Sequence, residues 1–177
     1  MKKLLLLTLV SLSFSSYGVV KLNFLDGSVY QGQTKDCFIG LIKKTCMQGM
    51  GVYSFKSGSK YLGEFNNNSP NGSGLFIYED GQTYEGYFKD GELHGKGVMS
   101  YPDGRRYEGD YKNNKRSGYG IMIYQDRGKY EEGSSYEGEW LDDKRNGKGV
   151  MIYLNDGRSL KGEFKEGVFI TPYYDDL

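Results

Sequence analysis

The chain has 177 residues, with 23 basic and 23 acidic side chains and a formal net charge of zero. Binding to nucleic acid or to an anionic membrane surface requires a basic stripe, but the basic residues here occur singly or in pairs such as Lys43-Lys44, Lys115-Arg116 and Lys144-Arg145. We therefore exclude nucleic acid as a partner and do not favour a membrane lipid. The 27 glycines and 17 tyrosines favour a thin sheet covered by aromatic rings over a globule with a thick core.

The first 18 residues have the composition of a secretory signal peptide. Two lysines precede an apolar run from Leu4 to Val10, and small residues at Ser16 and Gly18 suit a cleavage site near residue 18. The alternative is a transmembrane anchor, which needs about 20 apolar residues, and this run is shorter. We predict that residues 1–18 are removed and that the protein is exported, whether periplasmic, envelope-associated or secreted.

Residues 19–48 are predicted to form an irregular first hairpin. The segment from Phe24 to Gly32 has the spacing of the later hairpins, so we expect the first strand to start near Val20. The connection that follows is longer than the later ones and holds the two cysteines of the chain, Cys37 and Cys46. In an exported chain two such cysteines most simply form a disulfide. A redox pair or half of a metal site is the alternative, but the pair lacks Cys-x-x-Cys spacing and histidine companions.

Residues 49–167 repeat one pattern with a period of 23 residues, which lengthens only at the fourth and fifth copies. Each copy has a Tyr-x-Gly-x-aromatic segment, and a Gly-x-Gly begins nine residues after its middle glycine. The Tyr-x-Gly-x-aromatic segments begin at Tyr61, Tyr84, Tyr107, Tyr136 and, in a weaker form, Leu160. The Gly-x-Gly pairs begin at Gly49, Gly72, Gly95, Gly118 and Gly147. A fixed period of this length is the signature of a stacked repeat array.

This pattern resembles the MORN repeat, named for membrane occupation and recognition nexus, over roughly residues 49–167. The resemblance implies an all-β fold, an elongated twisted single-layer sheet of tandem antiparallel β-hairpins. It also implies a role in attachment and assembly, with lipid binding for some members of the family. Because one fold serves many functions, the resemblance predicts the architecture more closely than the function.

The sequence Tyr-Pro-Asp-Gly at 101–104 predicts the register of its hairpin. Proline suits the first central position of a type I turn, and glycine suits the residue with positive φ that closes the turn with a bulge. Such a turn places Tyr101 opposite Arg105 and Gly97 opposite Gly109. The period-two alternation of strands then puts Gly97, Tyr101 and Gly109 on one face of the sheet.

Glycines aligned in this way leave a floor without side chains, on which aromatic rings of the same and neighbouring hairpins can lie. The predicted structural glycines are Gly63, Gly74, Gly86, Gly97, Gly109, Gly120, Gly138 and Gly149. Rings left over on this ring-bearing face form the candidate binding surface, which comprises Tyr78, Tyr101, Tyr124, Tyr153 and Trp140. Tyr87 is expected on the opposite face.

That opposite face is mixed, with aliphatic residues such as Leu75 and Ile121 on one strand of a hairpin and acids such as Glu85 and Glu108 on the other. The sequence leaves open whether this face is solvated or used for binding. Other segments are assigned by their composition: polar exposed links at 66–71, 89–94, 112–117 and 141–146, a lengthened hairpin tip at 126–133, and a C-terminal cap and tail at 168–177.

No catalytic, cofactor or metal site is predicted. The single histidine, His94, lies in the repeat at a position suited to any polar residue. Glu85, Glu108 and Glu137 recur at one repeat position, which favours a structural role over an acid/base pair. Phosphate-binding glycine loops require a following helix, and no segment has helical periodicity.

The sequence therefore favours an exported, non-enzymatic binding or scaffold module that recognises a protein partner, or a second copy of itself, through an aromatic sheet surface. The first alternative is a membrane-surface or phospholipid-binding module. The second alternative is a carbohydrate binder or a small envelope enzyme.

Overall fold

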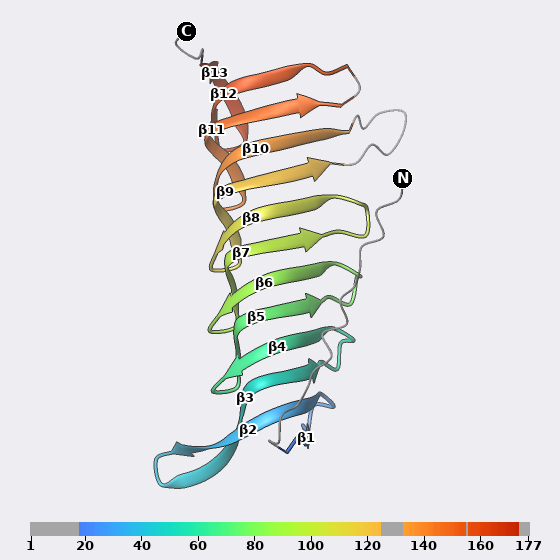
Figure 1. Cartoon of the computed structure of the whole chain (residues 1–177), viewed down its shortest axis with the longest axis vertical. Coiled ribbons are helices and arrows are strands. Elements are labelled where there is room, and N and C mark those ends of the chain that lie inside the picture. Colours follow the sequence, from blue (N-terminus) through green and yellow to red (C-terminus); the bar gives the residue numbers. More distant parts are fainter. Residues whose placement is uncertain (1–17, 125–132, 155, 174–177) are drawn as a thin grey trace.

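The computed structural model describes residues 18–124, 133–154 and 156–173, and these form one antiparallel sheet of 13 strands. The strands lie across the sheet in the order in which they occur in the sequence. The predicted all-β array of hairpins is confirmed, and Figure 1 shows it as a tall twisted stack one layer deep. The predicted signal peptide, apart from Gly18, and the predicted loop 126–133, apart from Gly133, lie outside the described residues.

The strands are β1 (Val20–Asn23), β2 (Val29–Ile39), β3 (Ile42–Ser54), β4 (Lys60–Asn66), β5 (Ser69–Ile77), β6 (Thr83–Lys89), β7 (Glu92–Ser100), β8 (Arg106–Lys112), β9 (Lys115–Tyr124), β10 (Ser134–Leu141), β11 (Lys144–Tyr153), β12 (Ser159–Lys165) and β13 (Val168–Pro172). The first strand begins at Val20, as expected. The segment predicted as a C-terminal cap begins with an edge strand that ends at Pro172.

Two kinds of turn alternate along the array. The turn after β7 is of the predicted kind: the Gly104 N–H donates to the Tyr101 carbonyl at 2.9 Å, and the Tyr101 N–H donates to the Arg105 carbonyl at 3.0 Å. Gly104 has a φ of 88°, which a residue without a Cβ adopts at little cost. Gly97 pairs with Gly109, so the predicted register is confirmed.

At the other end of the strands, the prediction of six-residue exposed links is wrong. The strands continue into these segments, with β6 running to Lys89 and β7 starting at Glu92, and only two residues turn the chain. In the turn between β8 and β9 these are Asn113 and Asn114, whose φ values are 51° and 68°. Positive φ at both central residues is the mark of the type I′ turn, whose twist suits a hairpin.

A bulge bends each strand just after the middle glycine of its Tyr-x-Gly-x-aromatic segment. In β8 the pairing with β9 passes from Gly109 to Tyr111 and skips Asp110. The hydroxyl of Tyr107 donates a hydrogen bond to the Asp110 carbonyl at 3.1 Å. The same bond, from a tyrosine to the residue three positions later, is made by Tyr30 to Gln33, Tyr61 to Glu64, Tyr84 to Tyr87 and Tyr136 to Glu139.

The tyrosines that make these bonds lie over a continuous row of glycines, one in each strand from β2 to β12. The row consists of Gly32, Gly51, Gly63, Gly74, Gly86, Gly97, Gly109, Gly120, Gly138, Gly149 and Gly162. A Cβ added to Gly109 would lie 2.5 Å from both the Tyr107 hydroxyl oxygen and the Cα of Gly120. The rings therefore occupy the space that side chains would need.

The core of the array is a ladder of edge-to-face rings on this side of the sheet. Tyr107 is 0% exposed, and its ring centroid lies 5.2 Å from that of Tyr111 and 5.3 Å from that of Trp140. Tyr30, Tyr61, Tyr84 and Tyr136 are equally buried and have similar neighbours. In Figure 1 the strand ends near the two-residue turns curve out of the plane of the sheet, and Leu93 from one of these ends packs in the same core.

Adding one methyl group to the glycine row should destabilise the array by displacing a buried ring. We expect Gly109→Ala to lower the free energy of unfolding by about 2 kcal/mol or more through overpacking. The matched control is Gly91→Ala, where the methyl meets nothing within 4 Å and only the φ of 87° resists it, at a cost of about 1 kcal/mol. Urea unfolding of both variants measures the difference; equal losses would contradict the ring-over-glycine packing.

Candidate functional site

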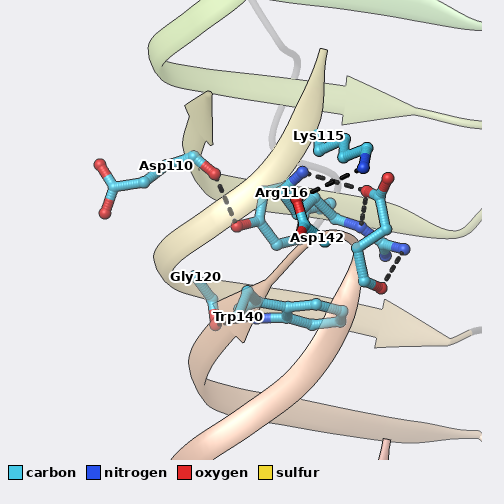
Figure 2. A network of polar contacts seen from close by, with 8 residues as sticks. Asp110, Lys115, Arg116, Gly120, Trp140 and Asp142 are labelled. Carbon is cyan, nitrogen blue, oxygen red and sulfur yellow. Dashed lines mark hydrogen bonds and ion pairs between the residues drawn. The ribbon is translucent and has the colours of Figure 1, made fainter. Parts of the chain in front are cut away.

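Trp140, one of the predicted surface rings, lies in the core. It is 4% exposed, and its Nε1 donates a hydrogen bond to the Gly120 carbonyl at 3.1 Å. The guanidinium of Arg116 stacks over its ring at 4.4 Å from the centroid, as Figure 2 shows from close by. Trp140 therefore helps to hold successive hairpins together and offers little surface to a partner.

In the basic pairs at the two-residue turns of the repeats, Lys115, Arg116 and Lys144 are paired with acids of the next repeat. The backbone N–H and the Nε of Arg116 both donate to Asp143 Oδ1 at 3.0 Å, and Lys115 forms an ion pair with Asp142 at 3.4 Å (Figure 2). Lys144 is likewise paired with Glu166. These residues lie at the two-residue turns, and their pairing leaves no basic patch there.

Tyr78, Tyr101, Tyr124 and Tyr153, the other predicted surface rings, lie half-buried at the edge of the same core. They lie at the ends of β5, β7, β9 and β11, and the turns that follow Tyr78 and Tyr101 have three residues. Two of them carry a guanidinium over the ring, Arg105 over Tyr101 at 4.7 Å and Arg158 over Tyr153 at 5.4 Å. Each ring keeps a partly exposed side, and this tyrosine row stays a predicted contact surface.

A hollow lies on the opposite face of the sheet, whose role the sequence left open. It is a groove of about 1120 Å³ that crosses strands β3 to β9 above the backbone of the glycine row. Its floor consists of Gly63, Gly74, Gly86, Gly97, Gly109 and Gly120. With strands about 4.8 Å apart, a row of six glycines spans about 24 Å. The groove is therefore as long as about seven residues of extended chain.

One wall of the groove alternates between aliphatic and acidic side chains. In strands β5 to β9 the wall residues are Leu75, Glu85, Val98, Glu108 and Ile121, each opposite the next in the sheet. Glu108 pairs with Arg106 at 2.7 Å, whereas Glu85 has no hydrogen bond or ion pair to any residue in the described ranges. The wall therefore combines apolar contact area with an acid that is open to an incoming cation.

The opposite wall contains a break in the repeat. In four strands the residue after the middle glycine has a side-chain oxygen that accepts a backbone N–H from the next strand. The pairs are Gln33 with Met50, Glu64 with Ser73, Asp110 with Tyr119 and Glu139 with Lys148, at 2.8 to 3.0 Å. In β6 this position is Tyr87, which accepts no such bond in the described structure and is 45% exposed. Tyr87 gives up a bond that stabilises the fold and presents a ring to the groove.

Tyr119 is the second exposed ring of the groove. Its hydroxyl donates to Glu137 Oε1 at 2.9 Å, and this hydrogen bond raises the pKa of Tyr119 above its usual value. The bond holds the ring in place beside the groove. Sequence reasoning placed Tyr87 on the opposite face, where its substitution was expected to affect binding little, and gave Tyr119 no role. Aligning the repeats by the residue after the middle glycine would have singled out Tyr87.

The described residues offer little that resembles a catalytic or metal centre. Across residues 18–124, 133–154 and 156–173 there is no cluster of three or more His, Cys, Asp or Glu residues suited to a metal ion. His94 lies in β7 opposite Tyr87, and its side chain is half-buried. Within the same ranges no helix is long and apolar enough to cross a membrane.

A family model for the MORN repeat matches residues 47–60, 61–83, 84–105, 107–129 and 136–158, more than half of the chain. The chain belongs to the MORN repeat family. The five matched MORN repeats are the hairpins whose glycines and tyrosines are described above. MORN repeats are generally non-enzymatic and often mediate contacts with proteins or membranes.

No curated protein matches this MORN array. Among solved structures it is similar to the SAS-4 (dCPAP) TCP domain of Drosophila melanogaster, in complex with a proline-rich motif of Ana2 (dSTIL). The identity is 14%, the TM-score is 0.41, and the match covers 82% of this chain and 78% of that one. A likeness at this level carries no argument about function.

Outside the MORN repeats, β2 and β3 extend beyond the sheet as a hairpin arm, residues 34–47. A disulfide joins Cys37 and Cys46, whose Cα atoms are 5.9 Å apart. The extra residues of this connection therefore lengthen a hairpin instead of forming a loop. The sequence pointed to the disulfide but not to the regular pairing from Thr34 to Ile39 with Met47 to Ile42.

Purified, unreduced protein should contain no free thiol when it is denatured. The Cys37→Ser/Cys46→Ser variant should keep its sheet but lose about 2 to 3 kcal/mol of local stability in the arm, because a closed loop of about ten residues restricts the unfolded chain. Thiol titration and hydrogen exchange of residues 34–47 measure these two effects. Two titratable thiols before reduction would show that the bond does not form.

The MORN array should lose stability in alkali. Burial raises the pKa of Tyr30 and Tyr136 to about 12, whereas an unfolded tyrosine ionises near pH 10. Their contribution is fully present below about pH 10 and is lost as the pH rises from about 10 to about 12, because the unfolded chain then releases protons that the folded chain keeps. Urea midpoints should fall over this range, and Tyr136→Phe should reduce the slope; a constant midpoint would refute the linkage.

Proposed function

We propose that this protein is an exported, non-enzymatic MORN-repeat module that binds an extended segment of a protein partner along the groove opposite the rings. The observation that carries this proposal is Tyr87. A repeat that in four other strands uses this position to accept a backbone hydrogen bond has here an exposed ring in the groove. Departures from a structural rule of this kind concentrate at functional sites.

The chemistry of the groove favours a segment with alternating apolar and basic side chains. Leu75, Val98 and Ile121 offer apolar contact area between the acids. Glu85 is open to a lysine or arginine of the partner, whereas Lys96 on the other wall is already paired with Asp110 at 2.9 Å. The partner segment would cross the strands, so side chains rather than backbone pairing would recognise it.

The side chains and backbone that line the groove are held in place by the fold, which favours binding of a partner segment. Tyr119 is held by Glu137, and the glycine floor is held from beneath by buried tyrosines. Binding to a surface that is already ordered loses little conformational entropy, and tyrosines that remain partly exposed are typical anchors of protein interfaces.

Several parts of this proposal rest on the sequence. Export is supported by the composition of residues 1–18 and by the Cys37–Cys46 disulfide, since disulfides persist in oxidising compartments. The tyrosine row of Tyr78, Tyr101, Tyr124 and Tyr153 is the second proposed contact surface, for the same partner or for another copy of the chain. Phospholipid and carbohydrate binding through the repeats are the alternatives.

Selection of peptides from a random displayed library against the full protein tests the groove. We expect the selected peptides to share a consensus of about seven residues, in which basic residues lie between apolar ones. Tyr87→Gln should weaken their binding about tenfold without lowering the unfolding midpoint, because glutamine fills the same position at Gln33 and accepts a backbone hydrogen bond there at 3.0 Å. Glu85→Gln should selectively weaken the peptides that carry a basic residue.

Tyr101→Ala is the matched control from the tyrosine row. If Tyr101→Ala weakens binding and Tyr87→Gln does not, the partner lies on the ring-bearing face, and the groove proposal is wrong. Selection of acidic peptides alone would also refute it.

A further inference from the structure

The hairpin arm is the second place where the chain departs from its repeat. It occupies the same end of the strands as the two-residue turns, and Figure 1 shows it projecting beyond the base of the stack. From the pair Thr34 and Met47 to the pair Ile39 and Ile42 the strands advance five residues. At about 3.4 Å per residue the arm reaches about 17 Å past the sheet. The disulfide ties its two strands together.

The tip of the arm is apolar and almost entirely exposed. Four adjacent side chains make it up: Phe38 at 67% exposure, Ile39 at 62%, Leu41 at 101% and Ile42 at 63%. The corresponding turns of the later hairpins carry polar pairs such as Asn113 and Asn114. Exposed apolar side chains that cluster at one point mark a site of association, so the tip requires an apolar partner.

Two lysines lie directly behind this tip, and a third lies near the base of the arm. Lys43 is the first residue back along β3, Lys44 is the second, and Lys35 is four residues behind Ile39 along β2. The one acid of the segment, Asp36, is paired with Lys43 at 2.8 Å. The arm as a whole therefore carries an excess of two positive charges, on a chain whose formal net charge is zero.

From this arrangement we propose that the arm is a membrane anchor whose apolar tip inserts into the interface of an anionic bilayer. An interfacial element buries its apolar part about 5 to 10 Å deep at the boundary of headgroups and acyl chains. Phe38, Ile39, Leu41 and Ile42 are the side chains that would be buried there. Lys43 and Lys44, the first two residues behind the tip, would lie at the level of the lipid phosphates, where each contributes electrostatic attraction and its alkyl chain follows the apolar surface.

A lipid surface explains the arm better than a protein pocket or a second copy does. A pocket would hold the tip but would not require Lys43 and Lys44 behind it, and the net positive charge of the arm would repel a second arm. A lipid surface satisfies both features at once. The anchor is separate from the groove, so the array could present its groove while the arm holds it to a membrane.

Vesicle binding of the full-length protein tests the anchor. The probes are vesicles of phosphatidylcholine alone and of phosphatidylcholine mixed with phosphatidylglycerol. We expect sedimentation with the mixed vesicles, reduced about tenfold by Leu41→Asp and by Lys43→Gln/Lys44→Gln. Leu25→Asp is the matched control, because Leu25 is also fully exposed at a turn but lies off the arm. Residues 1–18 are the same in all variants, so any vesicle binding by this segment is the same in each.

A local reporter makes the result specific to the arm. In Phe38→Trp the new indole should shift to shorter emission wavelength with the mixed vesicles and be quenched by lipids brominated on the acyl chain, whereas the buried Trp140 should not respond. The proposal is overturned if Leu41→Asp and Leu25→Asp bind vesicles equally, or if the indole introduced at the tip is not quenched. Loss of a dimer on Leu41→Asp, without any vesicle binding by the parent protein, would instead identify the tip as a contact between copies.

Discussion

The hydrogen bond from the Tyr107 hydroxyl to the Asp110 carbonyl, repeated in four other strands, is the interaction on which the array depends. To reach a carbonyl three residues away, the ring must lie along its own strand over the middle glycine, which is why a side chain there is excluded. The bulge at the same point bends the strand, and the bent ends bring Leu93 and Trp140 into the ring ladder. A one-layer sheet thereby acquires a core, although sheets normally need a second layer to bury a face.

Because the tyrosine, its hydrogen bond and the middle glycine recur with nearly the same geometry in each copy, positions that break the pattern stand out. Most residues after the middle glycine accept a backbone hydrogen bond, and Tyr87 does not. Most two-residue turns are polar, and the tip at Gly40 and Leu41 is not. Both departures expose large side chains to solvent. The repeat thus provides an internal reference against which candidate sites are recognised.

The sequence predicted those features that follow from local geometry. The turn at 101–104 fixed the register, and alternation then placed the glycines opposite each other. What covers a face does not follow from alternation, so Trp140 was predicted to be a surface ring and proved to be buried. The ion pair of Arg116 with Asp143 joins residues of different hairpins and is invisible to a search for basic clusters. The two-residue turns were missed although Asn-Asn and Asp-Gly pairs tolerate positive φ.

The agreement between the order of strands in the sheet and in the sequence has a consequence for how the chain folds. All-β proteins usually fold slowly because distant segments must meet before any contact stabilises them. Here each strand needs only the strand before it, so the loops to be closed are short. Such an array can nucleate in one hairpin and grow by neighbours. A chain that emerges residue by residue from a ribosome or a translocation channel could therefore add each hairpin to a structure that already exists.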